Sequence, residues 1–176
     1  MGCGHQGHEE FSLPLGRMLA RLEVHLLTGG GSGVMQSVSE GFHSVAERPG
    51  LVLGILPGSH GNGSPVPPEG YPNKYVELVI RTHLPDRGED GVSILSRNAI
   101  NIATSDAVII LPGGSGTASE AKLAREFDKP VIGFGGGGSL LNINQAESLA
   151  EVEQFLRAAL QRTCPHQHTG NRLPKG

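Results

Sequence analysis

The stretch AVIILPGGSGTASE, residues 107–120, decides the fold class because it joins an apolar strand to a glycine turn and then to a helix. Ala107–Leu111 has the composition of a strand buried in a parallel sheet. The turn Pro112–Gly116 follows, and the residues after it predict a helix that runs to about Phe127. A strand, a tight turn and a helix in succession form the repeating unit of parallel α/β sheets.

The same alternation continues outward from this stretch in both directions. Its last helix is well marked, because Ser148 and Glu151 form a capping box and the apolar face ends near Thr163. The alternation predicts one Rossmann-like α/β domain over residues 1–163, with a mostly parallel sheet, helices on both faces and a polar tail over 164–176. Further helices are expected at Phe11–Leu22, about Val34–Val45 and Val92–Thr104, and further strands at Val24–Leu27, Leu51–Leu56, Tyr75–Ile80 and Val131–Phe134.

Two segments depart from the regular alternation of strands and helices: the start of the chain and the long loop over residues 57–73. A fold of this kind normally opens with a strand, yet only Met1–Gly4 precedes the loop before the first expected helix. We therefore expect the chain to start inside its first strand. Residues 57–73 are rich in Gly, Pro, Ser and Asn, and they predict a loop longer than usual, of the kind that often carries function.

Composition excludes several classes of protein. The 176 residues fit one globular domain with 37% hydrophobic and 18% charged residues and a net charge of −3. Nucleic-acid binding is not expected, because the chain has no basic run and few aromatic residues. No apolar stretch approaches the length of a membrane span, and no signal peptide is recognisable. Cys3 and Cys164 favour a reduced, cytoplasmic setting, and a disulfide between them is possible but unsupported.

Two glycine turns are expected at the same edge of the sheet, where ligands bind in open parallel sheets. Gly29–Gly33 follows one strand, Gly113–Gly116 follows another, and each leads directly into a helix. Free N–H groups at a helix start bind anions, and glycines let a phosphate approach the backbone. The residues expected to hold a phosphate-bearing ligand are Gly30, Gly31, Ser32, Gly33, Gly113, Gly114, Ser115, Gly116 and Thr117.

Neither turn matches a strict nucleotide-binding motif. Val34 stands where the dinucleotide pattern needs its third glycine, and no Lys-Ser or Lys-Thr pair follows Gly116 as a P-loop requires. One such turn could be no more than a tight connection between strand and helix. Two turns at the same sheet edge favour a ligand site.

Glu120 allows two interpretations. With Thr117 it fits a capping box, which would give it a structural role at the start of its helix. Beside a phosphate its carboxylate would be repelled unless a positive charge offsets it. Arg97 is permanently charged and could bind a carboxylate or a phosphate with two hydrogen bonds.

The histidines give weaker signals. Cys3, His5 and His8 could form a metal cluster, but no second Cys/His pair accompanies them, so a solvated loop is favoured and no metal is expected. His25 is expected to be structural. His166 and His168 are expected to be solvated in the tail, and no Ser-His-Asp order suggests a catalytic triad.

The segment Pro112–Glu120 is similar to the P-G-G-x-G-T-x-x-E signature of the LOG ("Lonely Guy") family, whose members were long labelled lysine decarboxylases. Gly29–Met35 resembles that family's G-G-G-x-x-G-L-M segment with one glycine shifted. Gly54–Pro57 resembles its G-x-x-P strand end, and Arg97 stands before the signature where the family has its functional arginine. The resemblance covers about residues 4–134.

This resemblance implies a Rossmann-like fold, usually dimeric, and hydrolysis of the N-glycosidic bond of nucleoside 5′-monophosphates. Glu120 would then stabilise the cationic ribosyl transition state or position water, as carboxylates do in glycoside hydrolysis. Arg97 would orient substrate and carboxylate, and it cannot be the general acid because it does not deprotonate. Met35 and Asn98 join the expected ligand-binding residues. No cofactor is required, and two or four copies are expected to associate.

Some residues resemble a sister branch instead. Asn98 replaces a lysine and Ser119 replaces a glutamate that the hydrolases commonly carry. Ser96–Asn98, Tyr71–Asn73 and Arg81–Pro85 are more similar to the branch that includes the molybdenum-cofactor carrier proteins. The alternative is therefore a carrier that binds molybdenum cofactor or a related nucleotide-type ligand without turnover. An oligomeric scaffold with vestigial sites is a third interpretation.

Overall fold

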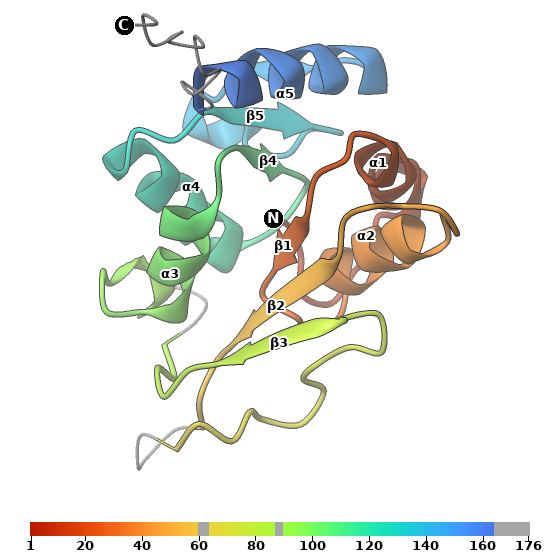
Figure 1. The fold of residues 1–176 in the computed structure, drawn as a ribbon. Helices are drawn as coiled ribbons and strands as arrows, with labels where there is room; N and C mark the ends of the chain where they lie inside the picture. Colours follow the sequence, from red (N-terminus) through yellow and green to blue (C-terminus); the bar gives the residue numbers. More distant parts are fainter. Residues whose placement is uncertain (60–63, 87–89, 164–176) are drawn as a thin grey trace, which may run out of the picture.

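The named strands of the computed structural model pair only in parallel, in two three-stranded sheets (Figure 1). The structure describes residues 1–59, 64–86 and 90–163. Cys164, His166, His168 and the rest of the predicted tail lie outside these residues. One sheet has the order β1-β2-β3 and the other has the order β4-β5-β6. The strands are β1 (Leu26–Thr28), β2 (Val52–Leu56), β3 (Leu78–Arg81), β4 (Val108–Ile110), β5 (Val131–Phe134) and β6 (Gln145–Ala146).

The first three residues extend the second sheet along β4. The Met1 amino group donates to the Ile109 carbonyl at 2.7 Å, and the Leu111 N–H donates to the Met1 carbonyl at 2.7 Å. The Cys3 N–H then donates to the Pro112 carbonyl at 2.9 Å. Figure 1 shows this end of the chain between β1 and β4. The N-terminal segment therefore lies between the two sheets, next to the strand that leads into the Pro112–Gly116 turn.

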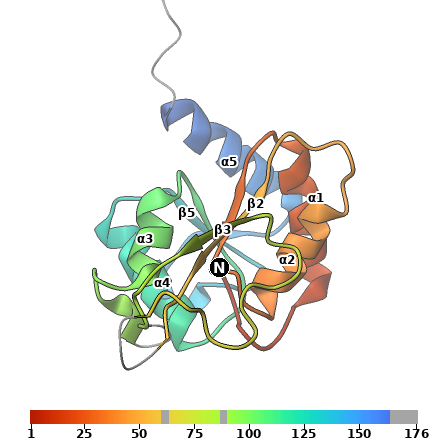
Figure 2. The same cartoon turned by 60° about the horizontal axis from the view of Figure 1, so that its bottom comes forward.

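Helices lie on both sides of the strands, which confirms the predicted Rossmann-like α/β class. Figure 2 shows α1 and α2 on one side and α3 and α4 on the other. Their apolar faces fill the core, where Leu15, Phe42, Ile102 and Leu123 are at most 1% exposed. The helices are α1 (Glu9–Arg21), α2 (Val34–His43), α3 (Arg97–Thr104), α4 (Ser115–Glu126) and α5 (Leu149–Thr163), with short 3-10 helices η1 (Asp90–Val92) and η2 (Ser139–Leu141).

The predicted helix Val92–Thr104 is wrong in its first turn. α3 begins only at Arg97, because Ser96 caps it by accepting the Ala99 N–H at 3.2 Å. The Ser96 hydroxyl also donates to the Gly91 carbonyl at 2.7 Å, which holds the preceding segment in a turn. Serine side chains compete with helical hydrogen bonds in this way. The correction places Arg97 at the first position of a helix.

Two other expectations differ from the structure. The strand predicted at Tyr75–Ile80 begins at Leu78, because the Asn73 side chain accepts the Tyr75 N–H at 3.1 Å and forms a turn there. The capping box of Thr117 and Glu120 is also wrong, since α4 begins at Ser115 with Gly114 as its cap. The capping box of Ser148 and Glu151 is confirmed, with the Glu151 N–H donating to the Ser148 hydroxyl at 3.3 Å.

Candidate functional site

The two glycine turns meet at the N-terminal segment, which sequence reasoning left out of the site. A β-carbon on Gly33 would lie 2.6 Å from the Gly4 carbonyl carbon and 2.8 Å from the His5 nitrogen. A β-carbon on Gly113 would lie 2.9 Å from the Cys3 nitrogen. Both turns therefore pack against one short segment. Its glycine-rich composition, with Gly2, Gly4 and Gly7 near one another, is the signal that could have indicated a third turn.

Arg97 is buried at the start of α3 with its guanidinium against the first glycine turn. Its exposed fraction is only 5%. A β-carbon on Gly29 would overlap Nη1 and would lie 2.8 Å from Cζ and 3.0 Å from Nη2 of Arg97. Gly29 is thus the residue that lets the guanidinium reach this position. A longer side chain at this point of the turn would exclude it.

Two nitrogens of the Arg97 guanidinium have no hydrogen-bond partner in the part of the chain that the structure describes. Its Nε and Nη1 atoms are fully buried and form no hydrogen bond with any described residue. Leaving a buried polar group unpaired costs about 1–3 kcal/mol, and more for a charged one. Such a cost is ordinarily offset by a partner, which here would have to carry hydrogen-bond acceptors and preferably negative charge. An unsatisfied arginine is therefore the clearest sign of an anion site in this chain.

Glu120, on α4, carries a buried carboxyl group that interacts electrostatically with Arg97. Burial raises the pKa of Glu120, while the positive charges of the Met1 amino group and of Arg97 act in the opposite direction. The two side chains do not form an ion pair within 4.0 Å of each other. The structure therefore brings Arg97 and Glu120 into electrostatic contact, as the sequence allowed but did not require.

The start of α4 adds further donors beside this pair. No side-chain hydrogen bond caps the helix at Gly114, and the first N–H groups of a helix have no partner within the helix itself. Thr117 is only 5% exposed, and its hydroxyl is buried without a hydrogen-bond partner among the described residues. In front of Gly114 a β-carbon would meet no atom within 4 Å. Gly113 differs, because Thr117 occupies the space beside it.

The glycines of the first turn are packed against protein atoms. Gly30 has a positive φ of 74° and faces the side chain of Leu56. Gly31 faces Met35 and Tyr71, and the exposed Ser32 donates its hydroxyl to the Gly4 carbonyl at 2.6 Å. We expected these glycines to make room for a phosphate. In the structure each of them also makes room for a neighbouring part of the fold.

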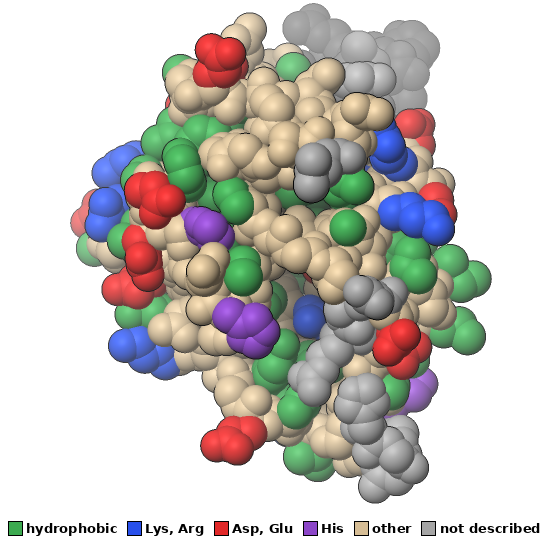
Figure 3. Space-filling view, turned by 180° about the vertical axis from the view of Figure 1, so that it is seen from behind, with side chains coloured by type: hydrophobic (Ala, Val, Ile, Leu, Met, Phe, Trp, Pro, Cys, Tyr) green, Lys and Arg blue, Asp and Glu red, His purple; other side chains and the backbone are tan. Residues whose placement is uncertain are grey.

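The remaining predicted residues lie around this centre. Asn98 is 2% exposed, its amide nitrogen faces Gly91, and its Oδ1 is buried with no hydrogen-bond partner among the described residues. Ser115 and Gly116 form the first turn of α4. Seen from behind in Figure 3, the surface is hollowed near its centre, and a lysine or arginine side chain is visible inside the hollow.

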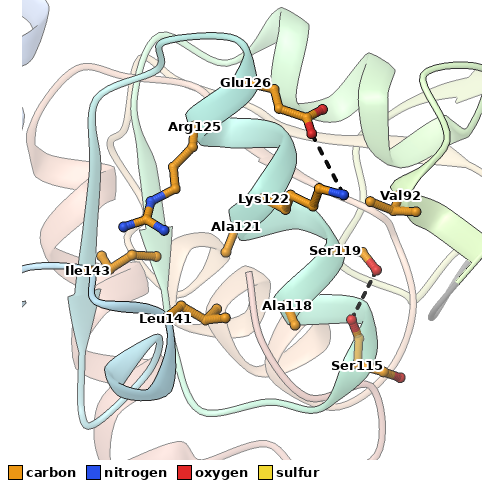
Figure 4. Close-up of a pocket in the computed structure, with 10 residues that line it drawn as sticks. All are labelled: Val92, Ser115, Ala118, Ser119, Ala121, Lys122, Arg125, Glu126, Leu141 and Ile143. Atoms are coloured by element: carbon orange, nitrogen blue, oxygen red, sulfur yellow. Dashed lines mark hydrogen bonds and ion pairs between the residues drawn. The ribbon is translucent and has the colours of Figure 1, made fainter.

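A separate cavity of about 560 Å³ lies along another face of α4. Figure 4 shows it between α4, Val92 of η1, and the segment that carries Leu141 and Ile143. On its wall the Ser119 hydroxyl donates to the Ser115 carbonyl at 3.1 Å. Thr117 and Glu120 do not line it. The two cationic residues of its lining are already engaged, because Lys122 pairs with Glu126 at 3.9 Å and Arg125 donates to the Asn142 carbonyl at 3.1 Å. It therefore fits an anion less well than the Arg97 centre does.

The histidine and cysteine residues that the structure describes do not gather into a metal site. No group of three or more potential metal ligands exists among residues 1–59, 64–86 and 90–163. The Cys3 sulfur instead accepts the N–H groups of His5 and Gln6 at 3.5 and 3.4 Å. His25 stands just before β1 and accepts the Leu51 N–H at 3.0 Å, a structural contact. In the same described part of the chain, no helix is long and apolar enough to span a membrane.

Comparisons with known proteins agree with this fold. A family model described as the SLOG cluster4 family matches residues 1–164. An uncharacterised protein of Archaeoglobus fulgidus is 30% identical over 133 residues, which are 74% of this chain and 74% of that protein. The resemblance to a Rossmann family of the LOG and molybdenum-cofactor-carrier kind is confirmed.

Two solved structures are similar over nearly their whole length. The structural-genomics target TM1055 is 24% identical with a TM-score of 0.70, and the match covers 90% of this chain and 96% of that one. The molybdenum cofactor carrier protein of Chlamydomonas reinhardtii is 25% identical with a TM-score of 0.68, covering 92% of this chain and 95% of that one. The similarity to TM1055 concerns the fold alone. The second similar structure is that of a protein that carries a small cofactor.

Proposed function

Because the chain belongs to the SLOG cluster4 family, we propose that it binds a phosphate-bearing, nucleotide-type ligand and hydrolyses the N-glycosidic bond of nucleoside 5′-monophosphates. The observation that carries the proposal is the buried guanidinium of Arg97, which has two unpaired nitrogens. A phosphate supplies the acceptor atoms and the negative charge that this group lacks. Arginine binds phosphate with two parallel hydrogen bonds, which fixes the orientation of the ligand as well as its affinity.

The surroundings of Arg97 support a phosphate in particular. The start of α4 has no side-chain cap and contributes N–H groups and the positive end of its dipole. The unpaired hydroxyl of Thr117 adds one more donor. A ligand phosphate between Arg97 and α4 would also give the buried, unpaired donors a hydrogen-bond partner. Ligand binding would therefore raise the free energy of unfolding of the protein.

Glu120 would then supply the chemistry at the sugar. In hydrolysis, the bond between C1′ of the ribose and the base nitrogen breaks, and water adds to C1′. One proton of the water goes to the base, and the products are ribose 5-phosphate and the free base. The transition state carries positive charge on the ribosyl ring, which the Glu120 carboxylate would stabilise. Since burial raises the pKa of Glu120, this role predicts a rate that rises with pH through that pKa.

Turnover is tested with AMP as substrate and chromatography of free adenine. We expect the wild-type protein to release adenine and ribose 5-phosphate in equal amounts, and Glu120→Gln to release neither above background. Glu40→Gln is the matched control, because Glu40 is an exposed carboxylate on α2. If wild type and Glu120→Gln release equal adenine, or if neither does, the hydrolase proposal is lost.

The carrier alternative has its own support in the 25% identical cofactor carrier and in Asn98 and Ser119, which depart from the hydrolase pattern. In that case the protein would hold molybdenum cofactor or a related ligand without turnover. Native mass spectrometry of freshly purified protein would reveal a retained ligand. Affinity kept in Glu120→Ala, with no base released by wild type, would favour the carrier over the hydrolase.

A cytoplasmic location and an assembly of two or four copies complete the proposal. The support for assembly is apolar surface beside the α4 cavity: Ile94 and Leu95 are 70% and 71% exposed. They lie close in sequence to Val92, which lines the cavity. Projecting apolar side chains next to an apolar cavity suit a second copy of the same chain across a two-fold axis.

A further inference from the structure

The segment Tyr71–Asn73 is fastened onto the first glycine turn. The Asn73 N–H donates to the Gly30 carbonyl at 2.7 Å, and its side-chain amide donates to the Gly31 carbonyl at 2.9 Å. Asn73 is only 6% exposed, and its Oδ1 accepts the Tyr75 N–H at 3.1 Å. With donors and acceptor all engaged, Asn73 fixes the position of Tyr71 relative to the turn.

The ring of Tyr71 lies directly on the backbone of Gly31. A β-carbon on Gly31 would lie 2.9 Å from Cε1 and 3.0 Å from Cζ of Tyr71, and 2.7 Å from Cε of Met35. Tyr71 and Met35 therefore meet above the glycine, where any other residue would push them away. Thioethers and aromatic rings pack favourably, so the two side chains form a continuous apolar wall at the turn.

This wall is close to the anion site. Arg97 lies against Gly29, only two residues before Gly31 in the same turn. Two residues span at most about 7 Å of chain. The buried cation and the aromatic wall thus flank one turn, at a separation that a single small ligand can bridge.

Tyr71 is also free to contact a ligand. Its side chain is half-buried, so part of it is accessible from outside the protein. Ligand sites typically combine apolar or aromatic walls with a few fixed polar groups. Here the polar group is Arg97 and the wall is Tyr71 with Met35.

We propose that Tyr71, supported by Met35, binds the planar ring of the ligand whose phosphate pairs with Arg97, and so selects ring-bearing phosphates over simple sugar phosphates. This inference rests on the proposed phosphate site. It narrows the ligand class to molecules with a phosphate at one end and a flat heterocycle at the other. Tyr71 is accordingly a specificity-determining residue that contacts the ligand.

The test is calorimetric titration with two probes, AMP and ribose 5-phosphate, which share the phosphorylated sugar and differ by the ring. Every protein titrated, including the one with the wild-type residue at position 71, carries Glu120→Gln so that AMP is not hydrolysed during the measurement. Removing an aromatic partner of a stacked base costs about 1–3 kcal/mol, which is roughly 5- to 150-fold in affinity. We expect Tyr71→Ala to weaken AMP binding at least fivefold and to leave ribose 5-phosphate within twofold. Tyr71→Phe should keep AMP affinity, because the ring and not the hydroxyl makes the contact.

Tyr75→Ala is the matched control, since Tyr75 is the other tyrosine of the chain and its ring faces His43. A variant that binds ribose 5-phosphate with the same affinity as the parent protein still has a correctly folded phosphate site. Equal weakening of both probes by Tyr71→Ala, or no effect on AMP, would overturn the proposal. Wild type that binds ribose 5-phosphate as tightly as AMP would overturn it while leaving the phosphate site intact. Wild type that binds neither probe would overturn the phosphate site and this inference with it.

Discussion

Replacing Gly29 by alanine should weaken ligand binding although the new methyl group is not expected to touch the ligand. The added β-carbon would overlap Nη1 of Arg97 and would stand 2.8 Å from Cζ. Non-bonded carbons settle at about 3.5–4.0 Å, so Cζ alone must retreat by roughly 0.7–1.2 Å, and Nη1, which the β-carbon would overlap, must move further. Gly29 has an ordinary negative or extended backbone conformation, so alanine itself introduces no backbone strain.

This displacement of the Arg97 guanidinium should weaken ligand binding strongly but change the stability of the fold little. A misplacement of about 1 Å can cost about 100-fold when it affects groups that must be aligned. We expect AMP affinity to fall at least tenfold, which corresponds to about 1.4 kcal/mol. The atoms that must move belong to the end of a flexible side chain, so the free energy of unfolding should fall by no more than about 1 kcal/mol, the low end of overpacking costs.

A double-mutant cycle measured by calorimetry separates this mechanism from others. The four proteins are wild type, Gly29→Ala, Arg97→Ala and the double variant, each carrying Glu120→Gln so that AMP is bound without hydrolysis, and each titrated with AMP. If alanine at position 29 acts through Arg97, it should have no further effect once Arg97 is absent. Equal losses from Gly29→Ala in both backgrounds would refute the reasoning. So would full AMP affinity in the single variant.

Three further predictions concern stability and assembly. Because burial raises the pKa of Glu120, the folded protein binds the carboxyl proton of Glu120 more tightly than the unfolded chain does. The free energy of unfolding should therefore fall as pH rises from the usual glutamate range through the raised pKa. Urea unfolding at several pH values should show this pH dependence in the wild type and a weaker one in Glu120→Gln. Ser96→Ala should lower the free energy of unfolding by about 0.5–2 kcal/mol through loss of the α3 cap, again by urea unfolding. Leu95→Asp should convert the assembly to monomers in light scattering, because it places a charge beside the exposed Ile94. Val66→Asp, at an exposed apolar residue away from Ile94 and Leu95 in the sequence, should leave the assembly unchanged. A wild-type protein that is monomeric throughout would contradict the assembly.

The strand–turn–helix unit at residues 107–126 was predictable because its signals are local. An apolar run, three glycines and a helical pattern follow one another without a gap. The start of α3 was not predictable from the same kind of signal. Whether Val92–Ser96 continues the helix depends on hydrogen bonds of Ser96 that hold it to Gly91, and periodicity does not record them.

The sequence indicated which residues belong to the candidate site better than it indicated how those residues contact one another. Arg97 and Glu120 were selected because they flank one strand, and in the structure the charge of Arg97 acts on the Glu120 carboxyl group without forming an ion pair with it. The dependence of Arg97 on Gly29 is a contact between distant parts of the sequence, so only the fold reveals it. Tyr71 was missed as a wall of the site for the same reason, since its place depends on the bonds of Asn73 to the turn.

The central claim is that Arg97 and the start of α4 hold the phosphate of the ligand. A crystal structure of the Glu120→Gln variant with AMP, which this variant should not hydrolyse, tests it most directly. We predict phosphate oxygens within about 3 Å of the Arg97 guanidinium and of the first N–H groups of α4. A phosphate bound elsewhere, for example in the cavity beside Ala118 and Ile143, with Arg97 still unpaired, would contradict the account.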